Sequence, residues 1–153
     1  MTVYRIVKRK HGANAFDGEG ARLYPGRWNF AGIKMIYTAQ SRSLAALEYF
    51  VHIGEERKHI EFVYFTIEVP DDLKIEKISM AQLPEDWNMQ PPNDSTRIIG
   101  TEWVKSTSSP VLQVPTVIVP DEYNFLLNPN HPDFNRINIE KPEPFQFDSR
   151  MWK

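Results

Sequence analysis

The chain has 153 residues, of which 41% are hydrophobic and 25% charged, and its 18 Lys and Arg residues nearly balance 20 Asp and Glu residues, for a formal net charge of −2. This composition is typical of a folded globular protein, and the charge gives no electrostatic reason to expect binding to nucleic acid or to an anionic membrane. The absence of cysteine excludes disulfides and thiol catalysis, and no apolar run approaches the roughly 18 residues of a membrane span. We therefore expect a single domain over residues 1–153, located in the cytoplasm.

The first part of the chain predicts a strand, a glycine-rich loop and a second strand. The stretch from Val3 to Lys8 is rich in strand-forming residues, and Met35 to Thr38 is a short apolar strand candidate. Between them lie five of the seven glycines, namely Gly12, Gly18, Gly20, Gly26 and Gly32. Glycines permit left-handed backbone and close approach to a ligand, so this loop is a candidate for contact with one.

A helix should follow, with Ser41 or Ser43 as its N-cap, because either hydroxyl can accept a hydrogen bond from the first turn. The apolar residues that recur at helical spacing are Leu44, Leu47 and Val51. Glu48 lies at the edge of this apolar stripe, which predicts a carboxylate at the rim of the core. Gly54 is the expected C-cap, and residues 55–59 are expected to form a charged turn or a frayed extension.

The middle of the chain predicts a central strand, a short strand and a covering loop. The run from Glu61 to Val69 (EFVYFTIEV) is rich in aromatic and β-branched residues, so it should lie in the interior of a sheet. Leu73 to Ile78 follows a turn at Pro70 and is expected to pair with this strand. Prolines interrupt the stretch from Ser79 to Pro92, which we expect to be an irregular covering loop.

A second helix is predicted from Ser95 to Ser106, with Asn93 or Asp94 as its N-cap. Its buried side chains should include Ile99 and Trp103. Gly100 should weaken this helix by up to about 1 kcal/mol relative to alanine.

The last part of the chain predicts strands separated by turns. Val111 to Val119 is strand-like, but Pro115 cannot donate a hydrogen bond to a neighbouring strand, so we expect an edge strand or a bulge just before Thr116. Asp121 to Pro132 is rich in turn-forming residues and contains three asparagines. A final strand is expected near Pro144 to Phe147.

Two modest helices among five or six short strands, without regular helical crossovers, predict an α+β fold rather than a doubly wound α/β sheet. The glycines match neither a Walker A loop nor a GxGxxG fingerprint, and no serine lies in a GxSxG elbow. His52 and His59 would lie about 10 Å apart along a continuous helix and could not share a metal ion. We therefore expect no metal site.

Four polar residues remain as a candidate site, and each also has an ordinary structural explanation. Arg27 could be a surface arginine stacked on Trp28, and Tyr37 a core aromatic with its hydroxyl at the surface. Glu48 could be a solvated helix residue, and Thr116 an ordinary strand threonine. The four residue types taken together favour a functional site over these separate explanations.

Three segments of the sequence carry a family resemblance: GEGARLYPGRWNFAG, IYTAQSRSLAALE and VPTVIVPDEYNFLLNPNHPDF. They resemble the RES domain, the toxin component of bacterial type II toxin–antitoxin modules, which is named for its arginine, glutamate and serine. The resemblance covers about residues 4–134. It implies a fold like that of ADP-ribosyltransferase toxins, with short mixed or antiparallel strands and a few helices.

The resemblance also implies which residues form the site. It places the family's arginine at Arg27, its tyrosine at Tyr37 and its glutamate at Glu48. The serine position is Thr116, which keeps the hydroxyl and adds a methyl group. Arg5 matches a further recurrent residue, so the residues implied to bind NAD⁺ are Arg5, Arg27, Tyr37 and Glu48.

The implied activity consumes NAD⁺ by breaking the nicotinamide–ribose bond, with water or phosphate as acceptor, and thereby arrests growth. NAD⁺ is the substrate, and no further cofactor or metal is implied. The carboxylate of Glu48 can oppose the positive charge of an oxocarbenium-like ribose, and the guanidinium of Arg27 can hold pyrophosphate. Tyr37 offers a stacking face for nicotinamide, and Thr116 a hydroxyl for its amide or for the ribose.

The implied partner is an antitoxin that carries a DNA-binding helix-turn-helix and closes the cleft, and an oligomer can form in that complex. Operator binding should come from this partner, because the chain has no basic stripe of its own. Two alternatives stay open. One is an ADP-ribosyltransferase that modifies a macromolecule, and the other is a catalytically inactive interaction domain, which the threonine at position 116 would suit.

Overall fold

The computed structural model describes residues 1–54 and 59–152 and is organised around an eight-stranded sheet. The strands are β1 Thr2–Lys8, β2 Ile36–Ala39, β3 Phe62–Glu68, β4 Ile75–Lys77, β5 Val111–Pro115, β6 Tyr123–Leu127, β7 Asn138–Ile139 and β8 Glu143–Phe145. The helices are α1 Glu19–Leu23, α2 Arg42–Phe50 and α3 Asp94–Ser106, with 3₁₀ helices η1 Arg9–Asn14, η3 Met80–Gln82, η4 Pro132–Arg136 and η5 Ser149–Trp152. The strand order is β4-β5-β6-β2-β1-β3-β7, and β8 also pairs with β3. The described pairs are antiparallel except β4 with β5, and the expected α+β class is confirmed.

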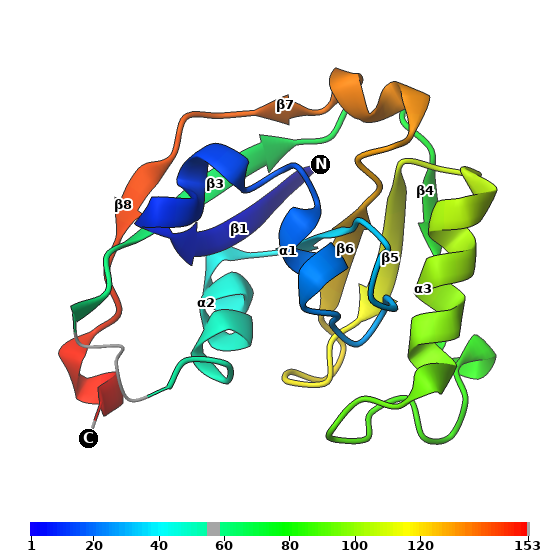
Figure 1. Ribbon diagram of the computed structural model, residues 1–153, viewed down its shortest axis with the longest axis horizontal. Coiled ribbons are helices and arrows are strands. Elements are labelled where there is room, and N and C mark those ends of the chain that lie inside the picture. The colour runs from blue at the N-terminus through cyan, green and yellow to red at the C-terminus, as the bar shows by residue number, and fades with distance from the viewer. Residues whose placement is uncertain (55–58, 153) are drawn as a thin grey trace.

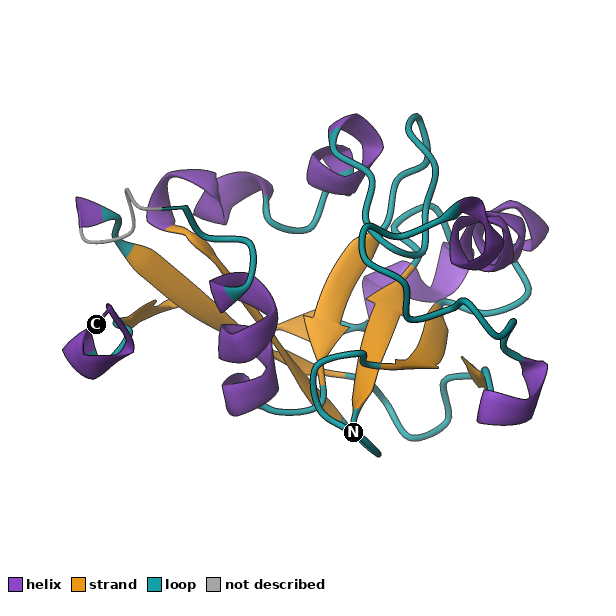
Figure 2. Ribbon diagram, turned by 90° about the horizontal axis from the view of Figure 1, so that it is seen from below, coloured by secondary structure: helices purple, strands orange, loops and turns teal. Residues whose placement is uncertain are grey.

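Two helices cover different parts of this sheet, as Figure 1 shows. α3 lies beside β4 and β5, where Trp103 packs in one apolar cluster with Leu126 of β6. α2 lies against β1, where Leu44 packs in another cluster with Ile6. Figure 2 shows strands of the two parts running in different directions, as expected of a strongly twisted sheet. Each helix therefore has its own apolar contact with the sheet.

The start of α2 is as predicted, but its end is not. Ser41 is the N-cap, because its Oγ accepts a hydrogen bond from the backbone N–H of Leu44 at 3.0 Å. The helix ends at Phe50 with Val51 as C-cap, three residues before the expected Gly54. Val51 is 59% exposed, so its assignment to the buried stripe was wrong. Of the charged turn expected over 55–59, residues 55–58 lie outside the described residues.

The interior position predicted for β3 is confirmed, whereas the predicted partner of β4 is wrong. β3 pairs with β1 along one side and with β7 and β8 along the other. No side of β3 is therefore open to β4, which instead pairs in parallel with β5 over Ile75–Lys77. Among the described residues, no helix is long and apolar enough to cross a membrane.

β5 is an interior strand, so the expectation of an edge strand or a bulge was wrong. β4 pairs with Val111 to Gln113, which leaves Pro115 beyond the reach of that pairing. The strand ends at Pro115, and Thr116 follows it. Its other neighbour is β6, which lies within the passage that we expected to contain turns.

α3 begins as predicted and packs closely on the glycine-rich loop. The side chain of Asn93 accepts a hydrogen bond from the backbone N–H of Ser95, and Trp103 is buried. A Cβ at Gly100 would lie 1.9 Å from the carbonyl oxygen of Trp28. Glycine at position 100 therefore permits the close contact between the helix and this loop.

Candidate active site around Glu48

Glu48 lies in α2, and its carboxylate meets side chains from two other parts of the chain. The hydroxyl of Thr116 donates to Oε1 of Glu48 at 2.6 Å, and Nδ2 of Asn124 donates to the same oxygen at 2.5 Å. Thr116 is buried, whereas Glu48 and Asn124 are half-buried. Within the described part of the chain, Oε2 of Glu48 has no hydrogen-bond partner. One oxygen is thus fixed by the protein, and the other is free to meet a ligand.

Arg27 lies in the glycine-rich loop and is held by the loop that follows η3. Its Nη1 donates to the carbonyl oxygens of Trp87 and Met89, both at 2.8 Å, and its Nη2 donates to Oε1 of Gln90 at 3.0 Å. These bonds use three of the five guanidinium N–H groups. Partial burial lowers the pKa of Arg27, and the negative charge of Glu48 acts in the opposite direction. Three contacts with one neighbouring loop therefore fix the position of the Arg27 guanidinium.

Two residues of α3 hold the backbone on either side of Arg27. The hydroxyl of Thr96 donates to the carbonyl oxygen of Arg27 at 2.7 Å, and Nε of Arg97 donates to that of Gly26 at 3.1 Å. Both bonds satisfy carbonyl groups of residues that lie outside the described helices and strands. The position of Arg27 consequently depends on α3, which lies about 70 residues further along the chain.

The hydroxyl of Tyr37 fixes the same loop from the side of the sheet. It donates to Oδ1 of Asn29 at 2.7 Å and accepts from the backbone N–H of Trp28 at 3.0 Å. Burial raises the pKa of Tyr37 well above its usual value, so the hydroxyl stays protonated. The ordinary explanation placed this hydroxyl at the surface, which is wrong, because it lies inside and supports the turn that carries Arg27.

Arg5 supports the strand that carries Tyr37. Its Nη1 donates to the carbonyl oxygen of Tyr37 at 2.7 Å, and its Nε is buried without a hydrogen-bond partner. Burial lowers the pKa of Arg5 to about 10, partly opposed by Tyr49 and Asp17. The guanidinium therefore remains charged at neutral pH. Arg5 lies near the Tyr4–Ala39 pair that joins β1 to β2.

The structure joins the candidate residues in two groups. Glu48 touches Thr116 directly, whereas Arg5 touches Tyr37, which reaches Arg27 through the turn at Trp28. The hydrogen bonds of Glu48 rule out a purely solvated helix residue, and Thr116 lies past the end of its strand. The described residues contain no hydrogen bond or ion pair between Arg27 and Glu48.

Sequence reasoning missed Asn124, whose amide contacts the Glu48 carboxylate. This residue lies in β6 between Ala39 of β2 and Val114 of β5. The passage was expected to form turns because of its asparagines and prolines. The alternation in YNFLL was the available signal, since it places Asn124 and Leu126 on one face of a strand.

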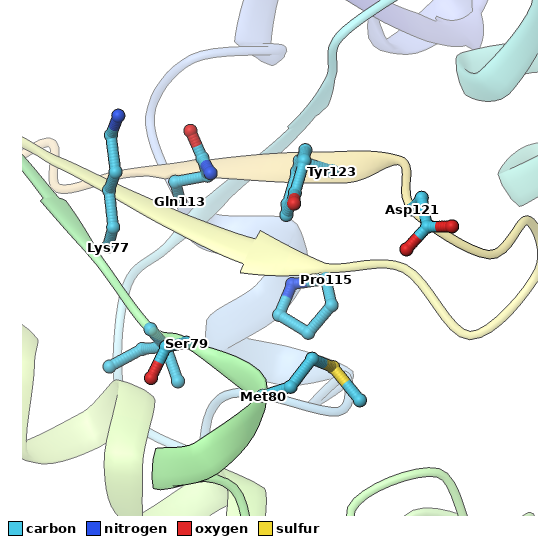
Figure 3. A pocket seen from close by; sticks show the side chains of 8 residues that line it. Lys77, Ser79, Met80, Gln113, Pro115, Asp121 and Tyr123 are labelled. Carbon is cyan, nitrogen blue, oxygen red and sulfur yellow. The ribbon is translucent and has the colours of Figure 1, made fainter.

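Figure 3 shows a cavity near the ends of the same strands, and Glu48 is not among the residues that line it. Lys77, Met80, Gln113 and Tyr123 are among the side chains that line it. Neighbouring residues of a strand point to opposite faces, so Tyr123 and Asn124 project from β6 in opposite directions. In residues 1–54 and 59–152, no group of three His, Cys, Asp or Glu side chains is placed to hold a metal ion.

Comparison with known proteins identifies relatives over nearly the whole chain. The family model described as RES domain matches residues 2–148. A protein named Toxin Res, from Photorhabdus laumondii, is 40% identical over 154 residues, which cover 100% of this chain and 98% of that protein. Prs ADP-ribosylating toxin, from a Sphingobium species, is 37% identical over 145 residues, which cover 94% of this chain and 90% of that protein.

A solved structure shares the fold. It is the M. tuberculosis MbcT–MbcA toxin–antitoxin complex, in which one chain matches this one with a TM-score of 0.75. The match covers 94% of this chain and 83% of that chain, at 19% sequence identity. At this identity the comparison supports the arrangement of strands and helices and carries no residue assignment.

Proposed function

The chain belongs to the RES domain family, and from that membership we propose that it is the toxin of a toxin–antitoxin module and breaks the nicotinamide–ribose bond of NAD⁺. The observation that carries the proposal is the Glu48 carboxylate, with Oε1 held by Thr116 and Asn124 and Oε2 left free. Nicotinamide leaves as a neutral group, so the reaction needs no acid to protonate it. It needs a negative charge beside the developing ribose cation, which Oε2 of Glu48 can supply.

The other candidate residues suit the binding of the dinucleotide. Arg27 has two N–H groups beyond those used by its loop contacts, and a planar guanidinium can bind two phosphate oxygens at once. Tyr37 holds the turn that carries Arg27 and offers its ring to nicotinamide. Arg5 anchors the strand of Tyr37 by donating a hydrogen bond to the carbonyl oxygen of Tyr37. The hydroxyl of Thr116 acts through Glu48 rather than on the substrate amide, because it already donates a hydrogen bond to Oε1 of Glu48.

An ADP-ribosyltransferase is the second candidate function. It is favoured by one observation, the 37% identity to a protein whose name is Prs ADP-ribosylating toxin. The same carboxylate would stabilise the same ribose cation, and the acceptor would be a protein group instead of water or phosphate. An inactive interaction domain is disfavoured, because Thr116 keeps a hydroxyl in contact with Glu48.

The proposed partner is an antitoxin with a helix-turn-helix that covers the site in the cytoplasm until the toxin is released. The support is the shared fold with a chain of a toxin–antitoxin complex. Expression of this chain alone should arrest growth with falling NAD⁺, and co-expression of the neighbouring reading frame should restore growth. Arrest at a constant NAD⁺ concentration would contradict the proposal.

Product analysis with purified protein tests the reaction itself. The protein is incubated with NAD⁺ labelled in the adenylate half, with and without inorganic phosphate and with a cell extract. Free ADP-ribose identifies water as acceptor, a phosphorylated ADP-ribose identifies phosphate, and label on protein identifies the transferase. Intact NAD⁺ in every mixture would refute the proposed function.

A further inference from the structure

We propose that Asn124 is a positioning residue for Glu48. Its amide donates to Oε1 of the Glu48 carboxylate and so orients that group, while Oε2 stays available to the substrate. The inference rests on the proposed function, in which that carboxylate faces the ribose cation. It assigns a role to a residue outside the arginine, tyrosine, glutamate and hydroxyl of the candidate site.

The backbone of Asn124 is held on both sides. It pairs with Ala39 of β2 on one side and with Val114 of β5 on the other, in the interior of the sheet. Glu48 has a long side chain on a nine-residue helix and depends on its partners for a defined position. The bond from Nδ2 of Asn124 at 2.5 Å is a bond to an ionised group, which is stronger than one between neutral groups.

The two groups that donate to Oε1 of Glu48 differ in whether they can also accept a hydrogen bond. The hydroxyl of Thr116 can donate or accept, so by itself it would tolerate a protonated oxygen opposite it. The NH₂ group of Asn124 can only donate, and it therefore requires an oxygen that acts as acceptor. Together they specify Oε1 as the oxygen that stays within the protein, which leaves Oε2 as the one that meets the ligand.

The other end of the Asn124 amide indicates that the residue does more than fill space. Its Oδ1 is buried and has no hydrogen-bond partner. A buried acceptor without a partner lowers stability, so an apolar side chain of similar size would serve packing better. The bond that offsets this cost is the one to Glu48.

Two substitutions separate positioning from packing. Asn124→Asp keeps the shape of the side chain but replaces the N–H donor with a negative charge beside Glu48. Asn124→Ala removes both the N–H donor and the volume of the amide. For a positioning residue, kcat for NAD⁺ cleavage should fall about 10-fold in Asn124→Ala and about 100-fold or more in Asn124→Asp, with KM changing far less. A residue that only fills space predicts the opposite order, and that order would overturn the inference.

Asn128 supplies the matched control, because it is fully buried and its Nδ2 donates to a backbone carbonyl, that of Val104. Asn128→Ala should lower the melting temperature and leave kcat per folded molecule unchanged. Circular dichroism and thermal unfolding of each variant establish the folded fraction.

A paired exchange tests the contact without relying on activity. Glu48→Gln combined with Asn124→Asp exchanges donor and acceptor, so the double variant should be more stable to urea than the Asn124→Asp variant and should remain inactive. No recovery of stability would overturn the inference, whatever the wild-type activity. A wild type that consumes no NAD⁺ would instead refute the proposed function, and the stability comparison would still decide the contact.

Discussion

The hydroxyl of Thr116 lies 2.6 Å from Oε1 of Glu48 and at the same time accepts a hydrogen bond from the backbone N–H of Ile118 at 3.1 Å. It therefore joins the carboxylate in α2 to the backbone just past the end of β5. Serine and threonine can both make these two bonds, because both carry a hydroxyl on Cβ. Thr116, where the resemblance implies the family's serine, can therefore make both bonds that a serine would make.

Thr116→Ser should accordingly keep kcat within a few-fold of wild type, whereas the near-isosteric Thr116→Val should lower it at least about 10-fold. Valine removes the donor to Glu48 and leaves the N–H of Ile118 unpaired, which also costs about 1–3 kcal/mol of stability. Steady-state kinetics with urea unfolding measures both effects. Equal activity of the Val and Ser variants would show that the Thr116 hydroxyl has no role in the reaction and that the residue serves only to pack the structure.

Tyr37→Phe keeps the ring and removes the hydroxyl between Trp28 and Asn29. We expect the free energy of unfolding to fall by about 1–3 kcal/mol, because the N–H of Trp28 loses its acceptor. KM for NAD⁺ should rise, because the turn that carries Arg27 loosens. Tyr64→Phe is the control, since that hydroxyl is at the surface, and it should change stability by no more than about 0.5 kcal/mol. The same small effect at both positions would show that the Tyr37 hydroxyl does not support the loop.

Gly100→Ala should destabilise the protein by about 1–3 kcal/mol despite the higher helix propensity of alanine, because its Cβ would collide with the carbonyl oxygen of Trp28. Gly20→Ala in α1 is the matched control, because an added Cβ there has no atom within 4 Å. It should leave stability unchanged or raise it by up to about 1 kcal/mol. Thermal unfolding compares the two, and a stabilised Gly100→Ala variant would contradict the close packing of α3 on this loop.

Arg27→Lys should raise KM for NAD⁺ at least about 10-fold, because an ammonium group cannot keep the three loop contacts and also bind phosphate oxygens bidentately. Arg9→Lys, at an exposed arginine, should leave the kinetics unchanged. Wild-type KM in Arg27→Lys would show that position 27 needs a positive charge alone.

The sequence predicts the parts of this fold that depend on neighbouring residues. Ser41 and Asn93 are caps that act within their own first turns, so both helix starts could be placed from local signals. The run around β3 carries enough aromatic and β-branched residues to indicate an interior strand. Strand pairings between segments distant in sequence could not be predicted in this way. The pairing of β4 with β5 depends on which strands already occupy the sides of β3, which no local pattern reveals.

For the candidate site, too, some residues could be identified from the sequence, whereas some contacts could not. Glu48 could be placed at the rim of the core from helical spacing, and the family resemblance selected Arg27, Tyr37 and Thr116. The contact of Asn124 with Glu48 requires β6 to be recognised as a strand, and turn-forming residues on both sides of YNFLL obscured it. The contacts of Arg27 with residues 87–90 depend on how a long loop folds back, which residue type and spacing do not determine.

The rate of nicotinamide release by wild type and by Glu48→Gln tests the central claim most directly. Glutamine keeps the size of the side chain and removes the charge, so turnover should fall at least about 100-fold while NAD⁺ binding, followed by calorimetry, changes little. Glu102→Gln, at an exposed glutamate of α3, should behave as wild type. Turnover in Glu48→Gln equal to that of wild type would contradict the role of this carboxylate.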